Sequence, residues 1–106
     1  WVFGAGMALG RKVLRSNPQV NVFHRGFVAC DSYAGGEAAM AQLTCPVLFA
    51  LGSHDQMTSP KAAQGLVKAA QAAGKQVQIA HLPVGHNQMT EAPEETLAAI
   101  RDFLAR

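Results

Sequence analysis

The sequence has 106 residues, enough for one small domain, and with 49% hydrophobic and 15% charged residues it lacks the composition of a disordered chain. The formal net charge is only +2 and the nine lysines and arginines are spread along the chain, so we expect no nucleic-acid partner. No apolar stretch reaches the roughly 18 residues that a membrane-spanning helix needs, and we expect no membrane partner.

The first 44 residues have helical and irregular patterns. Apolar residues within 5–15 predict a short helix. Asn17 and Pro18 have the residue types of an N-cap and a first helical position, so they predict the start of a second helix. A glycine pair then predicts a turn, followed by one or two helical turns over 37–43. The apolar face expected on the second helix consists of Val20, Phe23, Phe27 and Val28.

Two strands are predicted in the remainder of the chain. Residues 46–51 form a continuous apolar run that ends at Gly52, as is typical of a strand buried on both faces of a parallel sheet. Residues 76–82 predict a second strand, with Val77 and Ile79 on one face. Two strands joined by a helix make a right-handed parallel βαβ unit, and the predicted fold class is therefore α/β.

A helix is predicted after each strand. Ser59 and Pro60 have the residue types of a helix start, and Gly74 ends the apolar stripe that follows them. Pro93 begins the last helix, with two glutamates in its first turn, where the helix dipole favours negative charge. The apolar stripe expected on that helix consists of Leu97, Ile100 and Leu104. We thus expect a helical segment of residues 1–44, followed by a β-α-β-α unit of residues 45–106.

Polar loops follow both predicted strands, with Asp55 in the first loop and His86 in the second. Functional groups of open α/β sheets lie beyond the carboxyl ends of the strands. If the two strands are parallel neighbours, Asp55 and His86 emerge at one edge and can share a hydrogen bond. A carboxylate bound to one imidazole nitrogen orients the ring and leaves the other nitrogen to act as a base. Asp55 and His86 are therefore the candidate catalytic residues.

Each histidine and the aspartate also have a non-catalytic interpretation. Asp55 taken alone suits a cap for the helix expected near Pro60, and His86 suits an exposed loop. His54 adjoins Asp55 but points elsewhere on an extended segment, so it lines the rim of a pocket at most. His24 and His81 are expected to be structural. Gln88 and Met89 either line the pocket or pack at the start of the following helix.

We expect neither a metal nor a cofactor. A metal site formed by His54, Asp55, His81 and His86 is conceivable, but no pair of them has helical i, i+4 spacing. Cys30 and Cys45 lack zinc spacing and form no disulfide framework, which predicts buried or half-buried free thiols in a reducing compartment and a cytoplasmic location. The start at Trp1, without a methionine, suggests truncation and leaves an upstream targeting segment open.

Residues 45–106 resemble the end of the α/β-hydrolase family. In that family a Gly-x-x-Asp loop, often with a nearby proline, follows the penultimate core strand, and a Gly-His loop follows the last one. Gly52, Asp55, Pro60, Gly85 and His86 match this order. The resemblance implies that Asp55 is the acid and His86 the base of a nucleophile–acid–histidine triad. It also implies, less directly, that residues 1–44 belong to a helical cap.

The family's nucleophile elbow, Gly-x-Ser-x-Gly, is absent from the sequence. The resemblance therefore implies a fragment of a hydrolase that starts after the nucleophile and acts, when whole, on an ester or a related small-molecule substrate. The nucleophile can be Ser, Asp or Cys, and Asp would shift the chemistry to epoxide or halide substrates. The alternative function is a small non-catalytic binding or assembly domain with a βαβα core.

The same resemblance predicts self-association of the chain. In the family, the strand that corresponds to residues 46–51 has a neighbour on each side, and only one of those neighbours is present here. Unpaired backbone groups along a strand are a template for pairing with another chain. We therefore expect a homodimer or a larger homo-oligomer.

Overall fold

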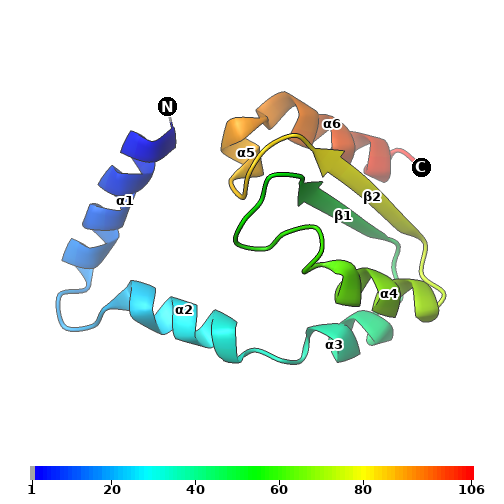
Figure 1. The fold of residues 1–106 in the computed structure, drawn as a ribbon, viewed down its shortest axis with the longest axis horizontal. Coiled ribbons are helices and arrows are strands. Elements are labelled where there is room, and N and C mark those ends of the chain that lie inside the picture. The colour runs from blue at the N-terminus through cyan, green and yellow to red at the C-terminus, as the bar shows by residue number, and fades with distance from the viewer. Residues whose placement is uncertain (1) are drawn as a thin grey trace. The chain divides into compact units, whose positions relative to one another are not determined.

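A computed structural model of the chain describes residues 2–106 and their side chains from residue 4 onward. It contains six helices and two strands over the described residues (Figure 1). In chain order they are α1 (Val2–Ser16), α2 (Val22–Ser32), α3 (Gly36–Gln42), β1 (Val47–Gly52), α4 (Gln64–Ala72), β2 (Val77–Leu82), α5 (Gln88–Glu91) and α6 (Pro93–Leu104). The predicted α/β class is confirmed. The chain divides into two compact units, Trp1–Ala34 and Gly35–Arg106.

The first unit consists of α1 and α2, and the second helix does not begin where the sequence predicted. Its N-cap is Asn21, whose side-chain oxygen accepts a hydrogen bond from the backbone N–H of His24 at 3.0 Å. Asn17 instead closes the end of α1, because its amide group donates to the carbonyl of Val13 at 3.3 Å. Both asparagines have a residue type that favours the N-cap position. Because residues 18–19 form a turn, α2 begins after Asn21 and not after Asn17.

The apolar face expected on the second helix is largely exposed. Its four side chains are each at least 39% exposed, and Phe27 is 60% exposed. No residue of α2 is buried. Within the first unit, the Phe23 ring contacts α1, where a Cβ built on Gly10 would lie 3.7 Å from it.

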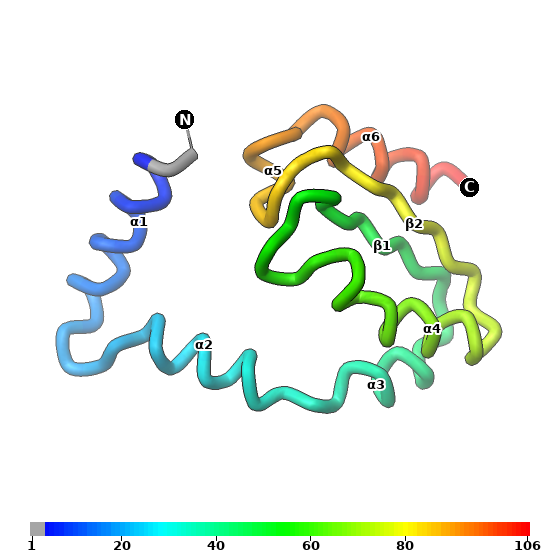
Figure 2. The backbone as a smooth tube through the Cα atoms, viewed as in Figure 1, coloured from blue at the N-terminus to red at the C-terminus, as the bar shows by residue number. Residues whose placement is uncertain are grey.

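The second unit is built on a two-stranded parallel sheet. Val47 pairs with Val77 and Gly52 pairs with Leu82, so the two strands end at the same level. Figure 1 shows α4 on one side of the strands and α6 on the other. The backbone trace in Figure 2 follows the same path from β1 through α4 to β2. Both predicted strands are confirmed to within one residue at each end.

A small core joins the sheet to α4. Phe49, Val67 and Ala70 are buried together. Met40 of α3 packs against them, which is why α3 belongs to the second unit. The boundary between the compact units consequently falls after Ala34, earlier than the predicted division after residue 44.

The ends of α4 follow the predicted signals in part. Ser59 accepts a hydrogen bond from the N–H of Ala62 at 3.2 Å, but residues 60–63 form a turn and the helix begins only at Gln64. Gly74 ends the helix as predicted, with a φ of 76° that favours glycine. Hydrogen bonds run back to the last turn from the N–H groups of Gly74 and Lys75, each at 3.1 Å.

The last helix packs on a different stripe from the one predicted. Pro93 begins α6, and two glutamates lie in its first turn, as expected. The stripe toward the sheet starts at buried Thr96 and continues with half-buried Ala99 and Phe103. Thr96 can be buried because its hydroxyl donates to the carbonyl of Gln88 at 3.2 Å. The predicted stripe of Leu97, Ile100 and Leu104 lies one residue further along the helix than the packed stripe. Its side chains are 42–73% exposed.

Two further expectations concern the thiols and the membrane. Cys30 and Cys45 are free, as expected, but both are exposed, so the prediction that they are buried or half-buried is wrong. Both lie outside the packed core, in α2 and in the connection between α3 and β1. Over residues 2–106, none of the helices combines the length and the apolar character needed to cross a membrane.

Candidate active site

The loops after β1 and β2 meet at one edge of the sheet. The N–H of Ser53 donates to the carbonyl of Leu82 at 2.8 Å, and the N–H of His54 donates to the carbonyl of Val84 at 3.0 Å. These bonds hold the two loops side by side. Within them, Nδ1 of His86 lies 2.9 Å from Oδ2 of Asp55. The structure therefore brings together the two residues that the strand topology predicted to meet.

Asp55 is held by four hydrogen bonds. Its Oδ1 accepts from the backbone N–H groups of Met57 and Thr58, each at 2.9 Å. Its Oδ2 accepts from the Thr58 hydroxyl at 3.1 Å in addition to His86. The carboxylate thus caps its own turn, while Ser59 caps the turn before α4. The side chain is only 4% exposed, so its geometry is fixed.

These contacts determine the ionisation of the acid. Burial by itself raises the pKa of the Asp55 carboxyl. The hydrogen bonds from the Thr58 N–H, the His86 ring, the Met57 N–H and the Thr58 hydroxyl outweigh that effect and lower the pKa from 3.8 to about 2. Asp55 is therefore a carboxylate at neutral pH and acts only as an acceptor.

The contact with Asp55 sets the tautomer of His86. Because the carboxylate can only accept, Nδ1 carries the proton and donates it to Oδ2. In the neutral form of the ring, Nε2 then carries no proton and has a free lone pair. The His86 side chain is 51% exposed, so this nitrogen can be reached from outside the fold. The arrangement thus places a buried carboxylate behind an accessible imidazole.

The backbone of Gly52 lies so close to that of Val84 and Gly85 that only a glycine fits without displacement. A larger residue at this position should therefore lower the stability of the fold. A Cβ built on Gly52 would meet the carbonyl oxygen of Gly85 and would lie 2.8 Å from that of Val84. Neither carbonyl can move away like a flexible side chain. We expect Gly52→Ala to displace the His86 loop and to lower the free energy of unfolding by about 1–3 kcal/mol, measured by urea denaturation.

The control for this substitution is Gly26→Ala. A Cβ at Gly26 would have no atom within 4 Å, and the position lies inside α2. We expect no loss of stability there, since alanine favours a helix over glycine. Equal stability of the Gly52→Ala chain and the parent chain would contradict the close approach of the two loops.

The other sequence candidates do not join this pair. The side chains of His54 and His81 are exposed, and His24 lies in the first unit. Over residues 2–106, no group of three or more His, Cys, Asp or Glu residues is placed to hold a metal. Gln88 is half-buried and donates to the carbonyl of Ala50 at 3.1 Å, whereas Met89 is 72% exposed.

Two residues at the site were missed by the sequence reasoning. Thr58 contributes a hydroxyl and an N–H to Asp55, and its hydroxyl also lies 3.3 Å from Nδ1 of His86. Glu91 contacts the His86 loop through its carboxylate. The spacing of Thr58 three residues after Asp55 is a signal for a capped turn. No pattern in the sequence predicted the contact of Glu91 with the His86 loop, because this contact depends on the turn of α5.

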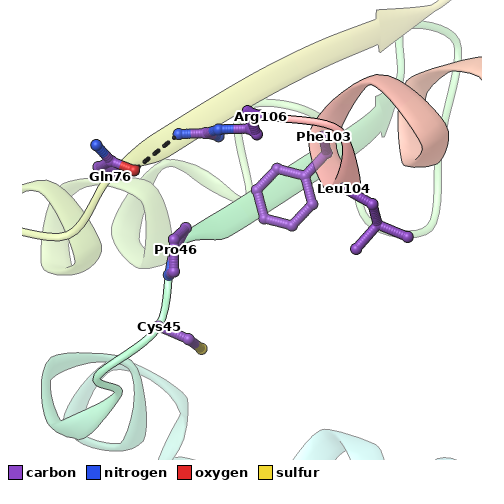
Figure 3. Close-up of a pocket in the computed structure, with 6 residues that line it drawn as sticks. All are labelled: Cys45, Pro46, Gln76, Phe103, Leu104 and Arg106. Atoms are coloured by element: carbon purple, nitrogen blue, oxygen red, sulfur yellow. Dashed lines mark hydrogen bonds between the residues drawn. The ribbon is translucent and has the colours of Figure 1, made fainter.

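A separate pocket of about 580 Å³ lies at the opposite ends of the strands (Figure 3). Arg106 donates to the side chains of Gln76 and Gln78, each at 3.1 Å, and lies over the Phe103 ring at 5.1 Å from its centroid. Its guanidinium is thus engaged within the protein. The residues that line the pocket are Cys45, Pro46, Gln76, Phe103, Leu104 and Arg106.

Comparison with known proteins adds no assignment to this geometry. No family model matches the sequence, and no curated protein and no solved structure was found to match it.

The lowered pKa of Asp55 predicts a specific dependence of stability on pH. The folded chain holds this carboxyl ionised more strongly than the unfolded chain does, so its contribution is fully present above about pH 4. It is lost as the pH falls toward 2. Urea denaturation at a series of pH values should therefore show a steeper loss of stability in this range for the parent chain than for Asp55→Asn. The same dependence of stability on pH in the two chains would contradict the lowered pKa of Asp55.

Proposed function

We propose that this chain supplies the acid, Asp55, and the base, His86, of a nucleophile–histidine–acid triad in an α/β-hydrolase. The observation that carries the proposal is the 2.9 Å contact between Asp55 Oδ2 and His86 Nδ1 at the carboxyl ends of two parallel strands. The substrate class is an ester or a related small molecule with an electrophilic carbonyl.

The proposed chemistry follows from the tautomer. His86 Nε2 takes the proton of the nucleophile as the nucleophile attacks the carbonyl carbon, and it then gives the proton to the leaving group. Asp55 stays ionised and stabilises the imidazolium that forms between these two steps. Its low pKa suits this role, because a carboxyl that protonates readily would release the ring.

The nucleophile is the missing part of the proposal. The sequence has no Gly-x-Ser-x-Gly element, and the family's triad runs in the order nucleophile, acid, histidine. We propose that the nucleophile and the oxyanion donors lie on the N-terminal side of residue 1 in the same polypeptide. The coding sequence upstream tests this directly, since a nucleophile elbow roughly one small domain earlier is expected there.

The chain by itself is expected to be inactive. A base and its orienting acid cannot replace a nucleophile and oxyanion donors. Purified chain should hydrolyse a small activated ester no faster than buffer. A rate well above buffer that disappears in His86→Ala would contradict this prediction, and would indicate a local nucleophile such as Ser53 in the loop after β1.

A second candidate function is a non-catalytic binding or assembly domain. The observation that favours it is the exposed apolar stripe of α6, in which Leu104 is 73% exposed. An upstream coding sequence without a nucleophile would favour this function over the hydrolase. For either function we propose a reducing, cytoplasmic location, because Cys30 and Cys45 are both free.

A further inference from the structure

The loop that carries His86 is held by a carboxylate outside the proposed triad. Oε1 of Glu91 accepts a hydrogen bond from the backbone N–H of Gly85 at 3.2 Å. Oε2 accepts from the backbone N–H of Asn87 at 3.1 Å. The two oxygens of one side chain therefore hold the backbone N–H groups of the residue before His86 and of the residue after it.

The short helix α5 places Glu91 for this contact. The N–H of Glu91 donates to the carbonyl of Asn87 at 2.9 Å, which closes a single helical turn directly after the loop. This turn brings the carboxylate back over the residues that precede it. Charge-assisted hydrogen bonds to a carboxylate are stronger than those between neutral groups, so they can order a loop that is otherwise exposed.

Gly85 has little free space on either side. A Cβ at Gly85 would lie 3.2 Å from one Glu91 oxygen and 3.4 Å from the other. On its other side, the Gly85 carbonyl is close to Gly52 at the end of β1. The backbone before His86 is thus held between the sheet and the Glu91 carboxylate.

We propose that Glu91 is a positioning residue for the base. By fixing the backbone N–H groups of Gly85 and Asn87, on either side of His86, it keeps the imidazole directed at Asp55 in the tautomer that leaves Nε2 free. This inference rests on the proposed function of the Asp55–His86 pair. It adds a residue that touches neither the substrate nor the ring and acts only through the loop.

The test uses the isotopically labelled chain and two readouts from NMR. The first is hydrogen exchange of the Gly85 and Asn87 amides, and the second is the low-field resonance of the His86 Nδ1 proton in its bond to Asp55. In Glu91→Ala we expect the two amides to exchange about tenfold faster and the His86 resonance to be lost. Glu91→Gln keeps one acceptor oxygen and should give an intermediate result.

The matched control is Glu94→Gln, which removes the same charge from the first turn of α6 and should leave both readouts unchanged. If Glu91→Ala fails to fold, as judged by the β1 and β2 amides, the similarly sized Glu91→Gln decides. An unchanged His86 resonance in the folded variants would overturn the inference, since Glu91 would then have a merely structural role.

Failure of the proposed function gives a different result. If the parent chain has no low-field resonance, or if Asp55→Asn does not remove it, the Asp55–His86 pair itself is absent. That outcome overturns the proposed function and the role of Glu91 together. If only the role assigned to Glu91 is wrong, the His86 resonance is present in the parent chain and in every Glu91 variant. It is then absent in Asp55→Asn.

Discussion

Turnover of the polypeptide that joins this chain to its proposed nucleophile should fall by a factor on the order of 10⁴ or more in His86→Ala. The reason is that His86 is the proposed base, and its imidazole is the one that contacts Asp55 in the part of the chain that the structure describes. Asp55→Asn should cause a loss of similar order, because the amide can donate to Nδ1 and so favour the wrong tautomer of His86. The steady-state rate of hydrolysis of an activated ester measures the loss of turnover in each variant.

The control is His54→Ala. His54 neighbours Asp55 in sequence, but only its backbone N–H is tied into the site, through the carbonyl of Val84 at 3.0 Å. Removing its imidazole should change turnover by far less than removing that of His86. If His54→Ala is the more damaging substitution, the assignment of the base is wrong.

The isolated chain is expected to form a dimer or a larger assembly at micromolar concentration. Over residues 2–106 the sheet contains only β1 and β2, so the outer edge of β1 has no neighbouring strand. The N–H groups of Val47 and Ser53 point to β2, and the alternate residues Leu48 and Ala50 therefore direct their backbone groups outward. The side chain of Gln88 bonds the outward carbonyl of Ala50, and the N–H of Asp55 bonds that of Gly52 at 3.1 Å. The backbone groups of Leu48 stay available to a second chain.

We propose an antiparallel pairing of two β1 edges about a two-fold axis. Leu48→Pro tests it, because the substitution removes an outward N–H without removing a bond to β2. Sedimentation should show an assembly for the parent and a monomer for this variant. Leu97→Lys, on the exposed stripe of α6, is the control and should still assemble. A compact, soluble monomer of the parent chain would contradict the proposal.

The pairing of Asp55 with His86 was predictable because it depends mainly on topology. A parallel βαβ unit brings the ends of its strands to one edge, whatever the detailed loop geometry. Each residue follows its strand by a few positions, so both had to emerge there. The contact at 2.9 Å is the consequence.

Other features were not predictable because they depend on local competition. Asn17 and Asn21 both carry a cap signal, and only the turn after Asn17 assigns the cap of α2 to Asn21. Thr96 faces the sheet in preference to Leu97, because a hydrogen bond to the backbone makes its hydroxyl tolerable there. Glu91 could be placed only once α5 was known. Periodicity encodes neither the local choice between two cap residues nor the contacts that place Thr96 and Glu91.

The central claim is that Asp55 and His86 act as one unit on a nucleophile, and a double-mutant comparison tests it most directly. Turnover is measured for the nucleophile-bearing polypeptide, for Asp55→Asn, for His86→Ala and for the double variant. Residues that act as a unit have strongly non-additive effects. We predict that the double variant is about as slow as His86→Ala alone. Losses that multiply in the double variant would show that the two residues act independently, and would contradict the account.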